Sequence, residues 1–437
     1  MSGGRPLVGH TLEFVRDPLG LLERGRREHG EIFGFEVAGQ SFACFAGPEA
    51  HQAYFAAKET VLSARDVYQF TIPIFGKGVA YDAPWEIFEE QLGFLFPALR
   101  DGRMRTYAGK IQKEAEAYVD RWSDGDVIDL PVAFNELTVF NASRCLLGDE
   151  IRERVEEEFA AAYHDLQGGI NAIGFFAPHL PTPAHRRRDR ARRKVAEIIG
   201  GVVRDRRRTG RTGEDFLQSI MDARYKDGRA LTEDEITGIL LTVLFGGQHT
   251  SAVLATWAAL LLAQHPHHYG LLRQEIDEVY PGDIEVTLDS LKAQQRLDRA
   301  VREAERMHPP LIMLVRKVLE DFAYRDVHLP AGTLAMVSPG MSHRIPEVFA
   351  NPHVYDPDRF APPRREDKVP YSLIGFGGGK HRCVGMGFAY MQLKTIFTVL
   401  LRRFTFELIT PMPTPDFGQW VTGPQDPCRV LVREVRR

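Results

Sequence analysis

The sequence has few cysteines, and their spacing builds neither a disulfide framework nor a zinc site. The four residues Cys44, Cys145, Cys383 and Cys428 include no CxxC pair. No secretory signal precedes them, because the N-terminus begins with the polar residues Met-Ser-Gly-Gly-Arg-Pro. We therefore expect reduced thiols and a cytoplasmic protein.

The sequence also lacks an excess of either charge and a long apolar run. Its 55 Lys and Arg residues against 59 Asp and Glu residues give a net charge of −4, which argues against nucleic-acid binding. No segment reaches the roughly 18 unbroken apolar residues of a membrane span, although peripheral contact with a membrane stays open. With 437 residues, 44% of them hydrophobic, the chain can build a large core, which excludes disordered and collagen-like classes.

Internal repeats and low-complexity linkers are absent, which favours one domain over residues 1–437. Residues 32–47 alternate and turn at Ala38-Gly39 as a β-hairpin does. Residues 109–123, 151–166 and 191–208 are charged and carry apolar residues at helical spacing. We predict a mainly α protein, a single large helical domain with a small β-rich region near 30–50 and in the C-terminal part.

The clearest single element is a helix that begins at Thr232, where Thr232-x-x-Glu235 forms a capping box, and ends before Pro266. At about 1.5 Å per residue it would be roughly 50 Å long and would cross the domain. A polar interruption, GGQHTS at 246–251, divides its apolar sequence. Two interpretations remain open: a kink, or a groove beside a cofactor.

A second conspicuous segment, residues 185–211, is dense in arginine. A solvated helix face and a docking surface for an acidic partner are both compatible with it. Nucleic-acid binding would require interleaved aromatic residues, which it lacks.

The segment that carries chemistry is Phe376–Gly385, FGGGKHRCVG, followed by an apolar-periodic helix. A lone cysteine in a glycine-rich loop at a helix start receives backbone N–H donors and the positive end of the helix dipole, so we expect a thiolate at Cys383. Such a thiolate suits an iron ligand better than a zinc cluster. A phosphate loop is disfavoured because His381 stands where Ser or Thr is required, while a buried structural cysteine remains the alternative.

This segment resembles the haem-thiolate signature F-x-x-G-x-[RH]-x-C-x-G of the cytochrome P450 family. Upstream, Glu303-Ala-Glu-Arg306 is similar to the family's E-x-x-R, and Asp356-Pro-Asp-Arg359 supplies a second arginine. Over almost the whole chain the sequence looks like the sterol 14α-demethylases of that family. The most specific matches are FGKGVAYD at 75–82, the HRRRDRARR run, ARYKDGRALTEDE at 223–235, GGQHTS at 246–251 and GKHRCVGMGFAYMQLK at 379–394.

The resemblance implies the cytochrome P450 fold with a helical haem-binding core over about 85–405. It implies a haem-thiolate monooxygenase that binds haem b and removes a sterol 14α-methyl group by three oxygenations, with release of formate. O2 and electrons from NAD(P)H would be needed, the latter through a ferredoxin or flavoprotein reductase, since the chain has no flavin or iron–sulfur motif. The alternatives are a hydroxylase of another polycyclic lipid (a steroid, hopanoid or other triterpenoid) and a haem-binding sensor or carrier.

The resemblance also assigns residues. Thr250 and His249 would act in oxygen activation and proton delivery, and Glu303, Arg306 and Arg359 would form a buried structural triad. The cofactor-binding residues would be Cys383 as axial iron ligand, Tyr68, Tyr81, Arg316 and His381 at the haem propionates, and Phe376. The substrate pocket would be lined by Phe70, Thr71, Phe75, Phe245, Ile312, Met313 and Trp420.

Five positions depart from the family pattern. Leu92 replaces a lysine that would reach a propionate, and Gln167 stands where an acidic residue normally pairs with the helix histidine, so we expect His249 to titrate lower. Ile170 and Ala172 replace residues that usually touch sterol, and Trp420 fills a C-terminal turn position that is often Met or Leu. These departures motivate the lipid hydroxylase alternative.

Overall fold

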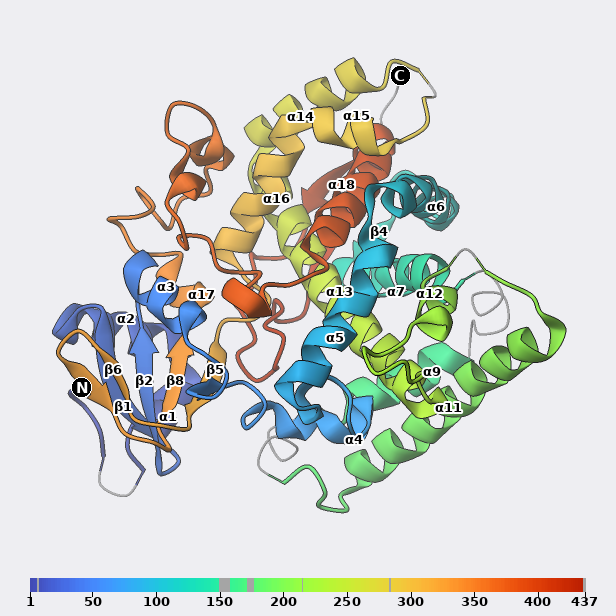
Figure 1. The fold of residues 1–437 in the computed structure, drawn as a ribbon. Helices are drawn as coiled ribbons and strands as arrows, with labels where there is room; N and C mark the ends of the chain where they lie inside the picture. The colour runs from blue at the N-terminus through green and yellow to red at the C-terminus, as the bar shows by residue number, and fades with distance from the viewer. Residues whose placement is uncertain (6–7, 149–157, 171–176, 214, 283, 435–437) are drawn as a thin grey trace.

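The computed structural model describes residues 1–5, 8–148, 158–170, 177–213, 215–282 and 284–434. Helices dominate it, and Figure 1 shows a β-rich region on one side of the helical part. The helices are α1 (Thr11–Arg16), α2 (Pro18–His29), α3 (Pro48–Ala56), α4 (Ile72–Phe75), α5 (Trp85–Leu95), α6 (Asp101–Val119), α7 (Leu130–Ala142), α9 (Glu158–Gln167), α11 (Pro183–Thr209), α12 (Phe216–Asp222), α13 (Glu233–Gln264), α14 (Pro266–Val279), α15 (Leu288–Ala293), α16 (Gln295–Met307), α17 (Pro339–Ser342) and α18 (Met386–Arg403).

The strands form three small sheets. The largest has the order β1-β2-β8-β5-β3, in which only the β2–β8 pair is parallel. The predicted hairpin is confirmed, because Val37 pairs with Gln40 around the turn at Ala38-Gly39. The strands are β1 (Ile32–Val37), β2 (Gln40–Phe45), β3 (Leu62–Ser63), β4 (Val127–Asp129), β5 (Leu314–Val318), β6 (Phe322–Tyr324), β7 (Val327–Leu329), β8 (Leu334–Val337), β9 (Phe404–Leu408) and β10 (Arg429–Glu434).

Helix α13 is the axis of the helical part and passes through its centre in Figure 1. Its predicted capping box is confirmed: the Glu235 N–H donates to Thr232 Oγ1 at 3.2 Å, and the Thr232 N–H donates to Glu235 Oε2 at 2.8 Å. The helix runs without a break through the polar interruption and packs against α7, α11 and α16. A Cβ added at Gly246 or Gly247 would meet no atom within 4 Å, so the interruption borders open space, which favours a groove over a kink.

The apolar side chains gather in one large cluster around α13 and in two smaller clusters at the β-rich region. Within the described ranges, α13 is the one helix whose length and composition would allow it to cross a membrane. However, 61% of its most apolar window is buried inside the protein, as is usual for a central core helix.

Candidate functional site

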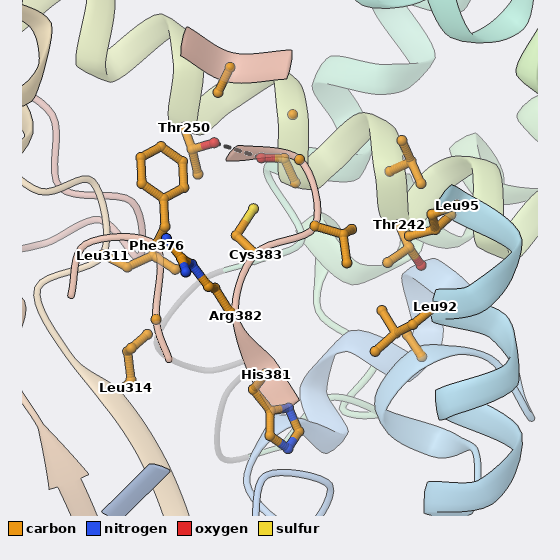
Figure 2. A pocket seen from close by; sticks show the side chains of 18 of the residues that line it. Leu92, Leu95, Thr242, Thr250, Leu311, Leu314, Phe376, His381, Arg382 and Cys383 are labelled. Carbon is orange, nitrogen blue, oxygen red and sulfur yellow. Dashed lines mark hydrogen bonds between the residues drawn. The ribbon is translucent and has the colours of Figure 1, made fainter. Parts of the chain in front are cut away.

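A cavity of about 380 Å³ lies between α13 and the glycine-rich loop before α18. Figure 2 shows the Cys383 thiol pointing into this space from the loop, with Thr250 on the opposite wall. Apolar side chains from several elements form most of the remaining wall, which is suited to a large, mainly apolar ligand. They include Phe88, Leu92, Leu95, Leu99, Val243, Leu254, Leu311, Leu314 and Val315.

The loop around Cys383 owes its course to its glycines. Gly379 has a φ of +59°, and a Cβ on it would collide with the backbone of Phe55, so a side chain is excluded there. The Cys383 N–H donates to the Phe376 carbonyl at 2.9 Å, which closes the loop. The local geometry therefore presents the thiol to the cavity at the start of α18.

The electrostatics at Cys383 differ in one respect from the expectation. The backbone N–H groups of Gly385 and Met386 lower the pKa of Cys383 in part, as the position at a helix start predicts. Burial is nevertheless the larger influence and raises the pKa of Cys383, so the protein alone does not favour the thiolate. A bound metal ion deprotonates a thiol that coordinates it. The position of Cys383 at the cavity therefore fits the role of a metal ligand.

Four polar side chains predicted to hold haem propionates surround the same cavity: Tyr68, Tyr81, Arg316 and His381. The rings of Tyr68 and Tyr81 stack with centroids 4.6 Å apart. The Arg316 side chain is only 3% exposed and donates to the Tyr54 carbonyl at 3.2 Å, and no carboxylate among the described residues forms an ion pair with it. A buried cation without an acidic partner is costly, so this position suits a ligand that carries a carboxylate.

His381 has an acidic partner on its other side. Its Nε2 lies 2.8 Å from Glu59 Oε2, and its ring packs near Trp85 with centroids 5.0 Å apart. Burial raises the pKa of Glu59, but the hydrogen bond and charge of His381, the Ala64 N–H and the charge of Arg316 together hold the pKa of Glu59 below its usual value. His381 therefore lines the cavity with an acidic partner behind it. Together with Cys383 and Arg316, this donor set fits a haem.

Glu303, Arg306 and Arg359 come together in the protein interior, and each is fully buried. Arg306 donates to both carboxylate oxygens of Glu303, at 2.9 and 2.8 Å, and Arg359 Nε donates to Glu303 Oε1 at 3.0 Å. The arginines also donate to backbone carbonyls of the segment that leads toward the loop. The group therefore fixes α16 against residues 343–359.

Thr250 faces the cavity from α13, and its hydroxyl donates to the Gly246 carbonyl at 2.6 Å (Figure 2). His249 points elsewhere: it does not line the cavity, and within the described part of the chain its Nδ1 is buried without a hydrogen-bond partner. Burial lowers the pKa of His249, which agrees with the expected direction, although the cause is desolvation.

Gln167 does not contact His249 as the family pattern suggested; it bonds to the neighbouring Gln248. The Gln167 amide donates to Gln248 Oε1 at 2.9 Å, and the Gln248 amide donates to Asn135 Oδ1 at 3.1 Å. Gln248 is 2% exposed, so these bonds form a buried amide chain that joins α9, α13 and α7. The sequence offered no signal for this partner, because adjacent positions on a helix face different directions.

The seven side chains predicted to line the substrate pocket are not among those that line this cavity. Phe70 packs on Trp420 with centroids 4.9 Å apart, and Phe75 packs on Phe245 at 5.8 Å. Thr71 donates to the Tyr68 carbonyl, Ile312 is buried, and Met313 packs at the β-rich region. Of the departing positions, Leu92 lines the cavity, Ile170 packs on the main core, and Ala172 lies outside the described residues.

Sequence reasoning missed the contribution of α5 and of Glu305 to the wall. Phe88, Leu92 and Leu95 recur at helical spacing on α5, so amphipathic periodicity could have indicated the face. Glu305 is an acid on the buried side of α16, and the periodicity of apolar residues does not predict that an acid is buried there.

The chain is similar to known proteins over almost its whole length. The family description Cytochrome P450 matches residues 2–432. Among similar proteins, an obtusifoliol 14-alpha demethylase of Triticum aestivum is 40% identical and a sterol 14alpha-demethylase of Mycolicibacterium vanbaalenii is 37% identical, each alignment covering 99% of this chain and 97% of the relative. A lanosterol 14-alpha demethylase of Mus musculus is 35% identical over 99% of this chain and 86% of its own.

The fold has a counterpart of known structure. The cyanobacterial CYP120A1 with bound retinoic acid superimposes with a TM-score of 0.88 over 99% of this chain and 98% of that one, at 22% identity. The fold, the thiol at the cavity and the matches along the whole sequence agree. The chain belongs to the cytochrome P450 family of monooxygenases, which use a haem, O2 and electrons from a redox partner.

Proposed function

We propose that this cytochrome P450 removes the 14α-methyl group of a sterol precursor. The relatives named as sterol 14-demethylases come from plants, bacteria and a mammal and align over nearly the whole chain, which supports this reaction. The observation that carries the proposal is the cavity itself. It is walled mainly by apolar side chains and has Cys383 and Thr250 on facing walls, as a rigid apolar substrate requires.

The protein's part in the chemistry is to bind, orient and exclude water. When bound, haem b would supply O2 activation and oxygen insertion at an unactivated carbon. Cys383 would hold its iron, and Arg316, His381, Tyr68 and Tyr81 would hold its propionates. The Thr250 hydroxyl, now held by the Gly246 carbonyl, can donate or accept a proton at the cavity wall.

Three oxygenations at one carbon account for the proposed reaction. Each consumes O2, two electrons and two protons and releases one water. The first converts the methyl group to an alcohol, the second converts the alcohol to an aldehyde with loss of a further water, and the third cleaves the carbon–carbon bond and releases formate. The apolar wall must hold the intermediates in place between rounds, because an early release would end the sequence at the alcohol or aldehyde.

The electrons would come from NAD(P)H through a ferredoxin or flavoprotein reductase. The arginine-rich segment predicted as a docking surface forms α11, where acids neutralise many of the cations: Arg192 pairs with Asp234 at 2.8 Å and Arg206 with Asp215 at 2.6 Å. Arg186, Arg190 and Arg193 remain exposed, and no ion pair joins them to another described residue. These three exposed arginines are the cations of α11 that can attract an acidic partner most directly, because no described acid pairs with them.

That subset is tested by neutralising Arg186, Arg190 and Arg193 together and measuring reduction by a ferredoxin. If α11 docks the partner, the rate falls and loses part of its salt dependence, because screening shortens from about 10 Å at 0.1 M to about 3 Å at 1 M. The matched control neutralises Arg208, which already pairs with Asp205 at 2.6 Å. Equal rates in wild type and the triple variant would mean that α11 is a solvated face.

The substrate is tested by titrating the purified holoprotein with lanosterol, obtusifoliol and a hopanoid, followed by product and formate analysis in a reconstituted system. Stoichiometric formate with a 14-demethylated sterol is expected. Hydroxylated lipid without formate would assign the hydroxylase alternative, and binding without turnover would assign a sensor or carrier. Cys383→Ala should abolish turnover and the thiolate-type spectrum with CO, whereas Cys44→Ala, buried in β2, serves as the control.

A further inference from the structure

Glu305 is a buried acid for which neither the triad nor the cavity chemistry has a use. Its side chain lies on α16, two residues after Glu303, and is 2% exposed. It borders two spaces at once: the cavity in front of Cys383, and a polar cleft of about 400 Å³ on the other side of the glycine-rich loop. Glu305 is therefore placed directly behind the segment that presents the cysteine.

The contacts of Glu305 connect α16, the loop and α18. The Tyr390 hydroxyl, on α18, donates to Glu305 Oε2. On the other side the loop closes so tightly that a Cβ added at Gly375 would collide with Glu305 Oε1. The carboxyl group is thus wedged between Gly375 and Tyr390.

The same contacts lead to the ligand itself. The Tyr390 ring packs on the Phe376 ring with centroids 5.3 Å apart, and the Phe376 carbonyl accepts the Cys383 N–H at 2.9 Å. A displacement of Tyr390 would therefore pass through Phe376 to the backbone of Cys383, over a path of packed rings and one hydrogen bond.

The burial of Glu305 has an energetic cost. Burial raises its pKa to about 7, although the Tyr390 hydrogen bond and the charges of Arg302 and Arg382 lower it in part and Asp298 raises it. A buried carboxyl group with a single side-chain hydrogen bond costs stability compared with an apolar residue of similar size. A glutamate at this buried position is explained if its hydrogen bond with Tyr390 has a structural role.

We propose that Glu305 is a positioning residue for the haem ligand: by accepting the Tyr390 hydrogen bond it fixes Phe376 and thereby the Cys383 loop. The hydrogen bond, and not the negative charge of Glu305, fixes the loop. Glutamine at position 305 can also accept the Tyr390 hydrogen bond through its side-chain oxygen, so Glu305→Gln should preserve the position of the Cys383 loop. Glu305→Leu cannot accept this bond and should not preserve it.

The experiment compares Glu305→Gln, Glu305→Leu, Tyr390→Phe and the double variant Glu305→Leu/Tyr390→Phe as holoproteins. Haem dissociation is followed by transfer to excess apomyoglobin, and ligation by the spectrum of the reduced protein with CO. We expect roughly tenfold faster haem loss in Glu305→Leu and in Tyr390→Phe, with part of each sample losing the thiolate-type spectrum. Glu305→Gln should stay within about twofold of wild type.

The double variant and a control separate positioning from general destabilisation. Because both single changes break one hydrogen bond, the double variant should lose haem no faster than the worse single variant. Glu275→Gln serves as the control: Glu275 is also a buried acid that accepts hydrogen bonds, from the N–H groups of Arg296 and Leu297 at the start of α16. It should lower the thermal midpoint without changing the CO spectrum.

Three results would overturn the proposal: wild-type haem loss and spectrum in Tyr390→Phe, haem loss in Glu305→Gln as fast as in Glu305→Leu, or multiplying effects in the double variant. If Glu305→Leu does not fold, the comparison of Tyr390→Phe with Glu305→Gln still decides. Turnover is not needed for any of these readouts, so the substrate proposed above can fail without affecting them.

Discussion

The buried group at Glu303 allows a prediction with a worked magnitude. Glu303 accepts three hydrogen bonds from Arg306 and Arg359 and a fourth from the Asp356 N–H at 3.0 Å, and its side chain is fully buried. Glu303→Gln removes the one charge that faces both guanidinium groups. Breaking a buried pair in this way costs about 3 to 5 kcal/mol, because a charge is left buried without its partner.

Two other acids provide a graded comparison. Glu366 pairs with the same Arg359 at 2.7 Å, so Glu366→Gln leaves that arginine still bonded to Glu303, and a loss of about 1.5 to 3 kcal/mol is expected. Asp289 pairs with Arg105 at 2.6 Å on the surface, where both side chains are more than half exposed. Asp289→Asn should cost less than about 1 kcal/mol.

The assay is urea unfolding of the three holoproteins, followed by far-UV circular dichroism and haem absorbance in the same samples. The free energy of unfolding should fall in the order Asp289→Asn, Glu366→Gln, Glu303→Gln, from the smallest loss to the largest. If Glu303→Gln loses no more stability than Asp289→Asn, the buried pairs do not hold the loop region and the reasoning is wrong.

Three shorter predictions concern the site and the pH response. Thr250→Ala should divert NADPH consumption from product to peroxide, measured as the ratio of product to NADPH, because it removes the hydroxyl at the cavity wall. Gln167→Glu should leave the pH profile of turnover unchanged, since the side chain faces Gln248; an upward shift would instead show coupling to His249. His51, whose pKa burial lowers to about 4, favours folding only while neutral, so stability should fall by up to about 3 kcal/mol as the pH drops from 6.5 to 4, and the fall should be shallower in His51→Gln.

Much of the fold could be predicted from local chemistry. The capping box at Thr232, the hairpin turn at Ala38-Gly39 and the helix after Cys383 depend on residues close together in the sequence, and each is present. The loop that presents Cys383 was also predictable, because glycines at positive φ and a helix start leave few conformations.

The interior of the site was less predictable, since it depends on which faces meet. Gln167 bonds to Gln248 because α9 meets α13 at that turn, a fact of packing that no spacing encodes. Leu92 lines the cavity with an apolar side chain, at a position where the family pattern has a lysine. Glu305 is a third case, because a glutamate is expected at the surface and this one is buried. Its burial is explained by the tertiary contact with Tyr390.

The open space beside Gly246 and Gly247 has a consequence for engineering. Alanine at either position would meet nothing within 4 Å, and in a helix interior alanine is favoured over glycine by about 1 kcal/mol. Two residues that weaken the helix therefore lie at the cavity wall, where a methyl group would occupy volume that is available to a ligand. Replacing either glycine with alanine should raise thermal stability and reduce the volume of the binding site, so stability and ligand size can be traded against each other at these two positions.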